Sequence, residues 1–423
     1  MKKQLLIMTV CICALIGALS QADNAESGSG GIVFKNVNII PMNEETVLKN
    51  CSVFVAKGKI EVIGKFEDLK IPESTKIIDA ENKYLVPGFS DMHVHIEHAD
   101  ERILFLANGV TLVRNMWGSV SLLKEIEEIH KKRLPCPEIY TTGPLIDGKG
   151  AYWRGSFIIE DPNKVAPAIK QMKADGFNAI KVYDKLSKEV YMEIIKTAKE
   201  INIPVMGHVP IAVGLKTVIH SGQKSIEHFN GYPAFDYYID NDLVDLTVKS
   251  GIWNCPTLVV FYKFKDMDKL QRQTIEEIKY VNRDLVKKWK YATGYNPPMN
   301  RYKKLLKVLF DNGARIVAGT DTGNPFVIAG FSLHEELQYM NEAGLTPYQV
   351  LLTTTKNAAE MLGYERRLGT IEKGKDADLV LLDKNPLEDI KNTKTIAGVM
   401  VKGVWLPKEL LQSMLAEVAE RNK

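Results

Sequence analysis

The chain has 423 residues, of which 45% are hydrophobic and 25% are charged, and its formal net charge is +3 from 55 basic and 52 acidic residues. These proportions are those of a globular protein, and they exclude a disordered, collagenous or coiled-coil chain. The balanced charge and the lack of a dense Lys/Arg stripe interleaved with aromatic residues argue against a nucleic-acid partner. The length suggests two or three domains and allows a large core with a pocket in it.

The first 22 residues have the pattern of an export signal. Two lysines precede an apolar run from Leu5 to Leu19, and small residues follow for cleavage before Asp23. The sequence therefore predicts an exported protein, periplasmic or secreted, with residues 23–31 as a flexible spacer. A retained N-terminal anchor is the alternative, although the apolar run is shorter than the ~20 residues that span a bilayer.

Short β-rich segments occur at both ends of the chain. Residues 32–62 contain three runs of β-branched and aromatic residues with turns between them, and the pattern returns after residue 368. We expect residues 32–84 and 366–423 to form one small β-sandwich domain built from both termini. The last stretch, residues 408–423, has the pattern of an amphipathic helix.

Between these ends, residues 85–365 alternate strand-like and helical patterns. Such an alternation predicts an α/β fold with a parallel sheet, and eight units favour a closed (β/α)8 TIM barrel. An open doubly wound sheet is the alternative, but no Gly-x-Gly-x-x-Gly follows the first strand. The strand candidates are residues 85–86, 111–114, 138–141, 179–183, 204–208, 225–228, 251–254 and 315–318.

One connection is longer than the others. Residues 261–307, between the seventh and eighth strand candidates, are rich in lysine, tyrosine and helical pattern. We expect them to form a helical cap over the barrel mouth, with an ordinary surface excursion as the alternative.

Side chains that can bind metals gather at the carboxyl ends of the candidate strands, where barrel enzymes place their catalytic groups. His93 and His95 alternate along the first strand and therefore project to one face, which makes a ready-made metal chelate. The chain has only eight histidines, and four of them stand at predicted strand ends. The other strand-end residues of this kind are Lys181, His208, His228 and Asp321.

Two of these residues have more than one interpretation. Lys181 could be a packing residue of the barrel. A desolvated lysine, however, has a depressed pKa and can add carbon dioxide to form a carbamate, an anionic ligand able to bridge two metals. Asp321 could be a turn former in Thr-Asp-Thr-Gly. As the only carboxylate at the eighth strand end, it is also the candidate base for a metal-bound water.

The strand-end residues lie within six motifs that follow one another along the chain. They are Val86-Pro-Gly-Phe-Ser-Asp-Met-His-Val-His95, Gly109-Val-Thr-Leu-Val-Arg114, Ile180-Lys-Val-Tyr183, Gly207-His208, Ser225-Ile-Glu-His228 and Ala318-Gly-Thr-Asp321. In this order they resemble the amidohydrolase superfamily, most of all its imidazolonepropionase-like and Xaa-Pro-dipeptidase-like branch. The resemblance extends from about Gly31 to the C-terminal β segments.

The resemblance implies a metal-dependent hydrolase of an amide or related carbon–nitrogen bond, with a dipeptide or a cyclic amide as candidate substrates. It implies two divalent metal ions, most often zinc, and a hydroxide that bridges them and attacks the substrate carbonyl. Asp321 would take the proton from the bridging water and pass it to the leaving amine. The implied ligands are His93, His95 and Asp321 for the first metal, His208 and His228 for the second, and carbamylated Lys181 as the bridge.

Two other functions stay open at the level of the sequence. One is an imidazolonepropionase-like hydrolase with a single metal, although such a site needs no bridging Lys181. The other is a non-catalytic exported binding protein, although none of the expected ligands is missing.

The substrate side of the site has two candidates. Asn230 and Tyr232 follow His228 closely along the chain and are expected to face the barrel mouth, with loop packing as the alternative. The partner that we expect is a small-molecule substrate, with no nucleic acid and no membrane once the signal is removed. A homo-oligomer stays open.

Overall fold

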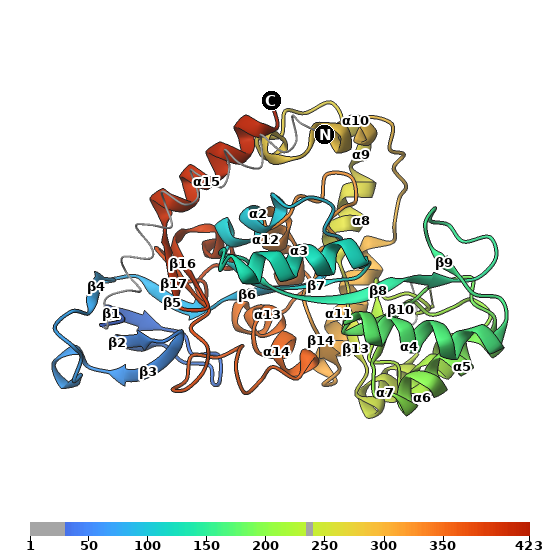
Figure 1. The fold of residues 1–423 in the computed structure, drawn as a ribbon, viewed down its shortest axis with the longest axis horizontal. Coiled ribbons are helices and arrows are strands. Elements are labelled where there is room, and N and C mark those ends of the chain that lie inside the picture. The colour runs from blue at the N-terminus through green and yellow to red at the C-terminus, as the bar shows by residue number, and fades with distance from the viewer. Residues whose placement is uncertain (1–29, 234–239) are drawn as a thin grey trace.

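The computed structural model describes residues 30–233 and 240–423 (Figure 1). The expected signal peptide, residues 1–22, and all but the last two residues of the expected spacer lie outside the described residues. Within the part of the chain that is described, no helix has both the length and the apolar character needed to cross a bilayer.

The centre of the fold is a parallel sheet whose strands follow one another in chain order. Neighbouring strands pair along a path of eight from β6 to β14, and the short β9 pairs with β8 at its side. The alternating sequence pattern predicted such a sheet. Its strands are β6 (Phe89–Val94), β7 (Val110–Asn115), β8 (Glu138–Asp147), β9 (Phe157–Ile158), β10 (Ala179–Val182), β11 (Val205–Gly207), β12 (Ser225–Glu227), β13 (Trp253–Cys255) and β14 (Arg315–Ile316).

Most of these strands are short, and nearly all of their residues are buried. This burial explains why their sequences are largely apolar runs and do not alternate regularly with polar residues. Helices packed on a parallel sheet bury the faces of its strands, and the apolar faces of these helices join the strands in one large core. The helices are α2 (Glu101–Ala107), α3 (Val120–Lys131), η2 (Pro162–Lys164), α4 (Val165–Asp175), α5 (Lys188–Glu200), α6 (Leu215–Ser221), α7 (Asn241–Ser250), α12 (Phe331–Glu342), α13 (Pro347–Thr354) and α14 (Lys356–Leu362).

The first strand of the path lies beside the segment that follows the last. The N–H of Met92 donates to the carbonyl of Ala318 at 2.9 Å, and the N–H of Asp321 donates to the carbonyl of His93 at 2.7 Å. The backbone therefore brings the first pair of predicted metal ligands next to Asp321.

The long connection between β13 and β14 is helical, as its sequence pattern predicted. The ring of Trp289 lies 5.2 Å from that of Phe326, so the connection packs on the segment that follows Asp321. Its helices are α8 (Leu258–Lys265), α9 (Met267–Leu270), η3 (Glu276–Tyr280), α10 (Arg283–Trp289) and α11 (Met299–Asp311).

A second, mostly antiparallel sheet is built from both ends of the chain. In Figure 1 its early strands (blue) and late strands (red) lie side by side. We expected a β-sandwich, but hydrogen bonds join all eight strands into one continuous sheet with an apolar core of its own. The elements of this part are β1 (Ile32–Ile39), β2 (Leu48–Ala56), β3 (Lys59–Gly64), η1 (Phe66–Asp68), β4 (Lys76–Asp79), β5 (Tyr84–Pro87), β15 (Leu379–Leu382), η4 (Ile390–Lys394), β16 (Ile396–Val401), β17 (Val404–Pro407) and α15 (Lys408–Arg421).

One predicted strand belongs to the other sheet. Leu85 lies in β5, opposite Leu381 of the antiparallel partner β15, so the parallel sheet begins with β6 instead. Only Gly88 separates the two strands. The apolar run through both strands therefore gave no sign of the break.

Asp378 ties the two sheets together at this break. The N–H of Gly88 donates to its carbonyl at 2.8 Å, and the N–H of Lys402 donates to its carboxyl group. Burial raises the pKa of Asp378 to about 7, whereas an unfolded chain gives about 3.9. The folded state therefore holds the proton more tightly than the unfolded state, and this group makes stability fall as the pH rises from about 4 to about 7.

We expect Asp378→Asn to remove that pH dependence, because an amide keeps the acceptor oxygen and cannot ionise. The advantage of the variant over the natural protein in unfolding free energy should grow by about 1–3 kcal/mol between pH 5 and pH 8. Urea titrations at the two pH values measure this growth. The exposed Asp68→Asn is the control and should show none; equal growth in both variants would contradict the assignment to Asp378.

Candidate metal centre

The histidines and the carboxylate that the sequence singled out converge at the carboxyl ends of the parallel strands. The ring of His93 lies 5.4 Å from that of His95 and 4.6 Å from that of His228, and the ring of His208 lies 5.0 Å from that of His228. An oxygen of Asp321 is 3.3 Å from Nε2 of His93 and 3.1 Å from Nε2 of His95. The structure therefore brings together residues from both ends of the parallel sheet.

Lys181 is buried in the same place, with 1% of its surface exposed. Burial lowers its pKa to about 8, against the opposing charges of Glu227 and Asp321. Gly207 on the neighbouring strand leaves room for it: a Cβ there would lie 3.1 Å from Cδ of Lys181 and 2.2 Å from the carbonyl of Val182. The lysine is thus enclosed, and it has a partly neutral amine near neutral pH.

Three of the four imidazoles are held through their Nδ1 atoms. A carboxylate can only accept a hydrogen bond, so the rings paired with carboxylates carry their proton on Nδ1 and their lone pair on Nε2. Proteins commonly orient metal-binding histidines in this way. The Nδ1 partners are Glu227 for His93 (2.9 Å), Asp184 for His208 (2.8 Å) and Thr257 for His228 (2.6 Å).

The Nε2 atoms fit a cation. In His93 and His208 this atom is buried and has no hydrogen-bond partner. Burial lowers the pKa of both rings and brings that of His228 to about 3, so the rings are neutral and can donate lone pairs. His93, His95 and Asp321 each offer one atom that can bind a metal, and these three atoms lie within 4.8 Å of one another. This donor set suits a divalent transition-metal ion.

Asp321 stays ionised within this group. Burial alone would raise its pKa, but the imidazoles of His228, His93 and His95 lower it far below the ordinary value. Its backbone has φ of 63°, in the left-handed region that residues other than glycine rarely adopt. Strain of this kind persists where the surroundings hold a functional group in one place.

A buried ion pair between Arg114 and Glu227 holds the ring of His93 through its Nδ1 atom. Arg114 and Glu227 are both fully buried, and a guanidinium N–H of Arg114 donates to the Glu227 carboxylate at 2.7 Å. The Ser225 hydroxyl donates to the other carboxylate oxygen. Arg114 and Lys181 keep the pKa of Glu227 below its usual value although burial raises it. Glu227 therefore presents a permanent acceptor to the ring of His93.

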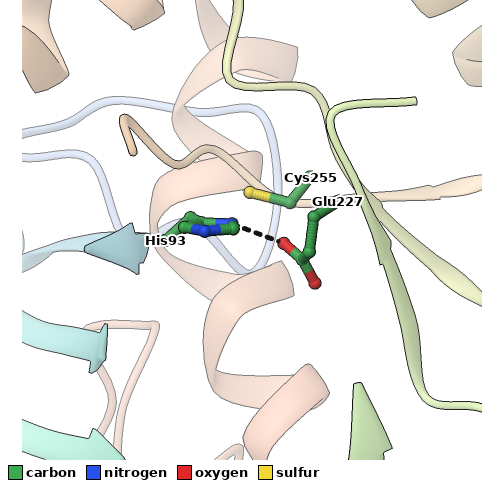
Figure 2. A group of neighbouring side chains, drawn as sticks. All are labelled: His93, Glu227 and Cys255. Atoms are coloured by element: carbon green, nitrogen blue, oxygen red, sulfur yellow. Dashed lines mark hydrogen bonds and ion pairs between the residues drawn. The ribbon is translucent and has the colours of Figure 1, made fainter. Parts of the chain in front are cut away.

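Cys255 completes a second group of ligand-type atoms with His93 and Glu227 (Figure 2). Burial raises the pKa of its thiol well above the ordinary value, and Glu227 already binds His93 and Arg114. We assign this group to support of the His93 ring. Gly319 is needed beside it, because a Cβ there would lie 2.5 Å from the sulfur of Cys255 and 2.8 Å from the backbone nitrogen of His93.

The two candidate substrate residues make packing contacts, as the loop-packing alternative predicts. The side-chain oxygen of Asn230 accepts a hydrogen bond from the N–H of Val209 at 2.8 Å, which links two loops. Tyr232 is 8% exposed, and its hydroxyl is 3.0 Å from that of Thr247 on α7. The structure therefore gives Tyr232 a packing position in the helical layer and Asn230 a loop-packing contact.

Sequence reasoning missed the residues that orient the imidazoles. Glu227 immediately precedes His228, and Asp184 follows Lys181 by three positions, so both stood inside quoted or neighbouring motifs. The available signal was a carboxylate next to a strand-end histidine for Glu227, and a carboxylate shortly after strand-end Lys181 for Asp184. Thr257 had no signal of its own, because its partner His228 is 29 residues away.

A profile described as "Amidohydrolase family" matches residues 105–406, which is more than half of the chain. The chain belongs to the amidohydrolase family. This confirms the resemblance that the six motifs indicated, and it makes the protein a hydrolase that acts on carbon–nitrogen bonds.

Individual relatives agree with the family. The chain is 24% identical over 410 residues to a 5-methylthioadenosine/S-adenosylhomocysteine deaminase of Caldanaerobacter subterraneus subsp. tengcongensis, covering 84% of this chain and 85% of that protein. Among solved structures it is similar to a bottromycin amidohydrolase (TM-score 0.77, 25% identity, 96% of this chain and 93% of that chain). A Xaa-Pro dipeptidase with bound methionine is also similar (TM-score 0.70, 22% identity, 89% and 99%).

Asp184→Asn is expected to loosen the ring of His208, because an amide is a weaker and less directional acceptor than a carboxylate. Partners of this kind typically change metal affinity by about 10- to 100-fold. Competition with a chelator, followed by metal analysis, measures the change. Asp175→Asn, at the exposed end of α4, is the matched control; unchanged affinity in Asp184→Asn would show that His208 does not bind metal through this pair.

Proposed function

We propose that the protein is a metal-dependent amidohydrolase with two divalent ions, which cleaves an amide or a related carbon–nitrogen bond such as that of a dipeptide or a cyclic amide. The observation that carries the proposal is the convergence of four imidazoles, one lysine and one carboxylate at one end of the parallel sheet. Buried polar atoms without partners are rare in folded proteins, and here His93 and His208 each offer one.

Each of these residues has a proposed role. A carbamate on Lys181 would give the anionic bridge between two ions, most often zinc in this family. The hydrogen bonds between the segment of Asp321 and that of His93 support the closed (β/α)8 barrel that would hold all ligands at one mouth. The ligands proposed are His93, His95 and Asp321 for the first ion, and His208 and His228 for the second.

Bound ions of this type lower the pKa of water and withdraw electrons from a carbonyl group. The chain supplies the remaining functions. Asp321 holds a carboxylate oxygen close to both His93 and His95, where it can accept a proton and return it to the leaving amine. Glu227 and Asp184 keep the rings of His93 and His208 in one orientation, so that the ligand atoms are in place before substrate binds.

Lys181→Ala and Asp321→Asn should fail in different ways. Lys181→Ala removes the bridge, so we expect metal and activity to be lost together and a small carboxylic acid to restore part of both. Asp321→Asn removes the base, so we expect more metal to be retained while kcat falls by roughly 10²–10⁴. Metal analysis beside turnover of an amide panel measures the two effects.

Full metal content and near-normal turnover in Lys181→Ala would make the lysine a packing residue. The site would then hold one ion, as in an imidazolonepropionase-like hydrolase. About two ions per chain in the natural protein, with loss of both in Lys181→Ala, is the result that supports the bridge.

We further propose that residues 1–22 direct export of the chain to the periplasm or the medium. The basis is the pair of lysines, the apolar run and the small residues before Asp23. The mature protein should begin near Asp23, as N-terminal sequencing of exported material will show. An intact Met1 in a membrane fraction would identify a retained anchor instead.

A further inference from the structure

Several exposed apolar side chains lie on connections that start at the ligand-bearing end of the parallel sheet. Of the eleven large apolar side chains exposed in the described part of the chain, seven lie on connections that follow β8, β11 or β13. His208 and His228 also follow strands of this sheet, so these connections start at the end of the sheet that carries the ligands. The seven residues are Tyr152, Trp153, Phe157, Ile158, Ile211, Tyr291 and Tyr295.

Trp153 is linked to the metal centre by two contacts. Its indole N–H donates to the hydroxyl of Tyr183 at 2.8 Å, and the ring of Tyr183 stacks on that of His208 with 3.9 Å between centroids. Trp153 is nevertheless 48% exposed. Tyr183 thus links an exposed indole to a proposed ligand, which is an arrangement that suits contact with a bound molecule.

Aromatic rings also stand on other sides of the centre. Trp117 lies 6.4 Å from the ring of His95, edge to face. Phe261 lies 6.3 Å from the ring of His228, and Tyr302 packs on Phe261 with 4.6 Å between centroids. The surroundings of the ligands are therefore aromatic on the β7, β10 and β13 sides.

Burial of apolar surface away from water is favourable, and exposed apolar patches mark positions where binding can bury them. Aromatic rings gain further from offset or edge-to-face contact with another ring. Resting on the proposed function, we propose that the substrate carries an aromatic or bulky apolar group next to the reacting carbon–nitrogen bond, and that Trp153 and Tyr183 form the surface that binds this group.

The test uses three compounds that differ only in the side chain: N-acetyl-L-phenylalanine, N-acetyl-L-alanine and N-acetyl-L-glutamate. Calorimetry on the purified protein with its metal gives Kd for each, and hydrolysis of the same compounds gives kcat/KM. We expect the phenylalanine compound to bind at least about tenfold more tightly than the alanine compound.

Three variants locate the preference. Trp153→Ala should reduce the ratio of the two Kd values by about three- to tenfold, and Tyr183→Phe, which keeps the ring but loses the hydrogen bond, should reduce it less. Ile77→Ala is the matched control, because Ile77 is an exposed apolar residue on β4 of the other sheet. It should leave the ratio unchanged.

The outcomes separate this inference from the proposed function. Hydrolysis without preference, or preference for the glutamate compound, overturns the inference and leaves the function standing. A phenylalanine preference in binding without hydrolysis of any compound supports the inference and counts against amide cleavage. No measurable binding of any compound overturns the inference, as does a change of oligomeric state in Trp153→Ala, because the exposed side chains would then form a contact between chains.

Discussion

The orientation of His93 in the candidate metal centre depends on one buried ion pair. Arg114 and Glu227 face each other with no exposed surface, and Glu227 uses the same oxygen to hold the ring of His93. Burying two charges costs several kcal/mol per ion unless hydrogen bonds compensate, and loss of one partner typically destabilises by about 3–5 kcal/mol. The pair therefore has a high desolvation cost, and removal of either partner would destabilise the fold. The position of the His93 ring is thus coupled to the stability of the sheet.

Much of the fold could be predicted because periodicity is a local property. The alternation of strands and helices and the β segments at both ends follow from patterns within short windows. The break between β5 and β6 could not be predicted, because both strands are apolar and only Gly88 separates them. The continuous form of the second sheet depends on pairings such as Leu85 with Leu381, which no local pattern contains.

The candidate site shows the same division. His93 and His95 could be paired from strand alternation alone, whereas the partners that orient the rings come from distant segments. Tyr232 was proposed only because it follows His228 closely along the chain. The backbone turns between them, since His228 and Phe229 have φ of 61° and 50°, and Tyr232 contacts Thr247 on α7. A position close to His228 along the chain therefore does not fix the direction of the Tyr232 side chain.

The second sheet has a consequence for how the chain is made. Strand β5 pairs with β1 on one side and with β15 on the other. During synthesis β1 and β5 are present long before β15. Until the C-terminal strands are made, one edge of β5 has no partner, and an open strand edge invites pairing with other chains. Newly synthesised protein should therefore be most prone to aggregation before residues 379–423 have been made, because β15 begins at Leu379.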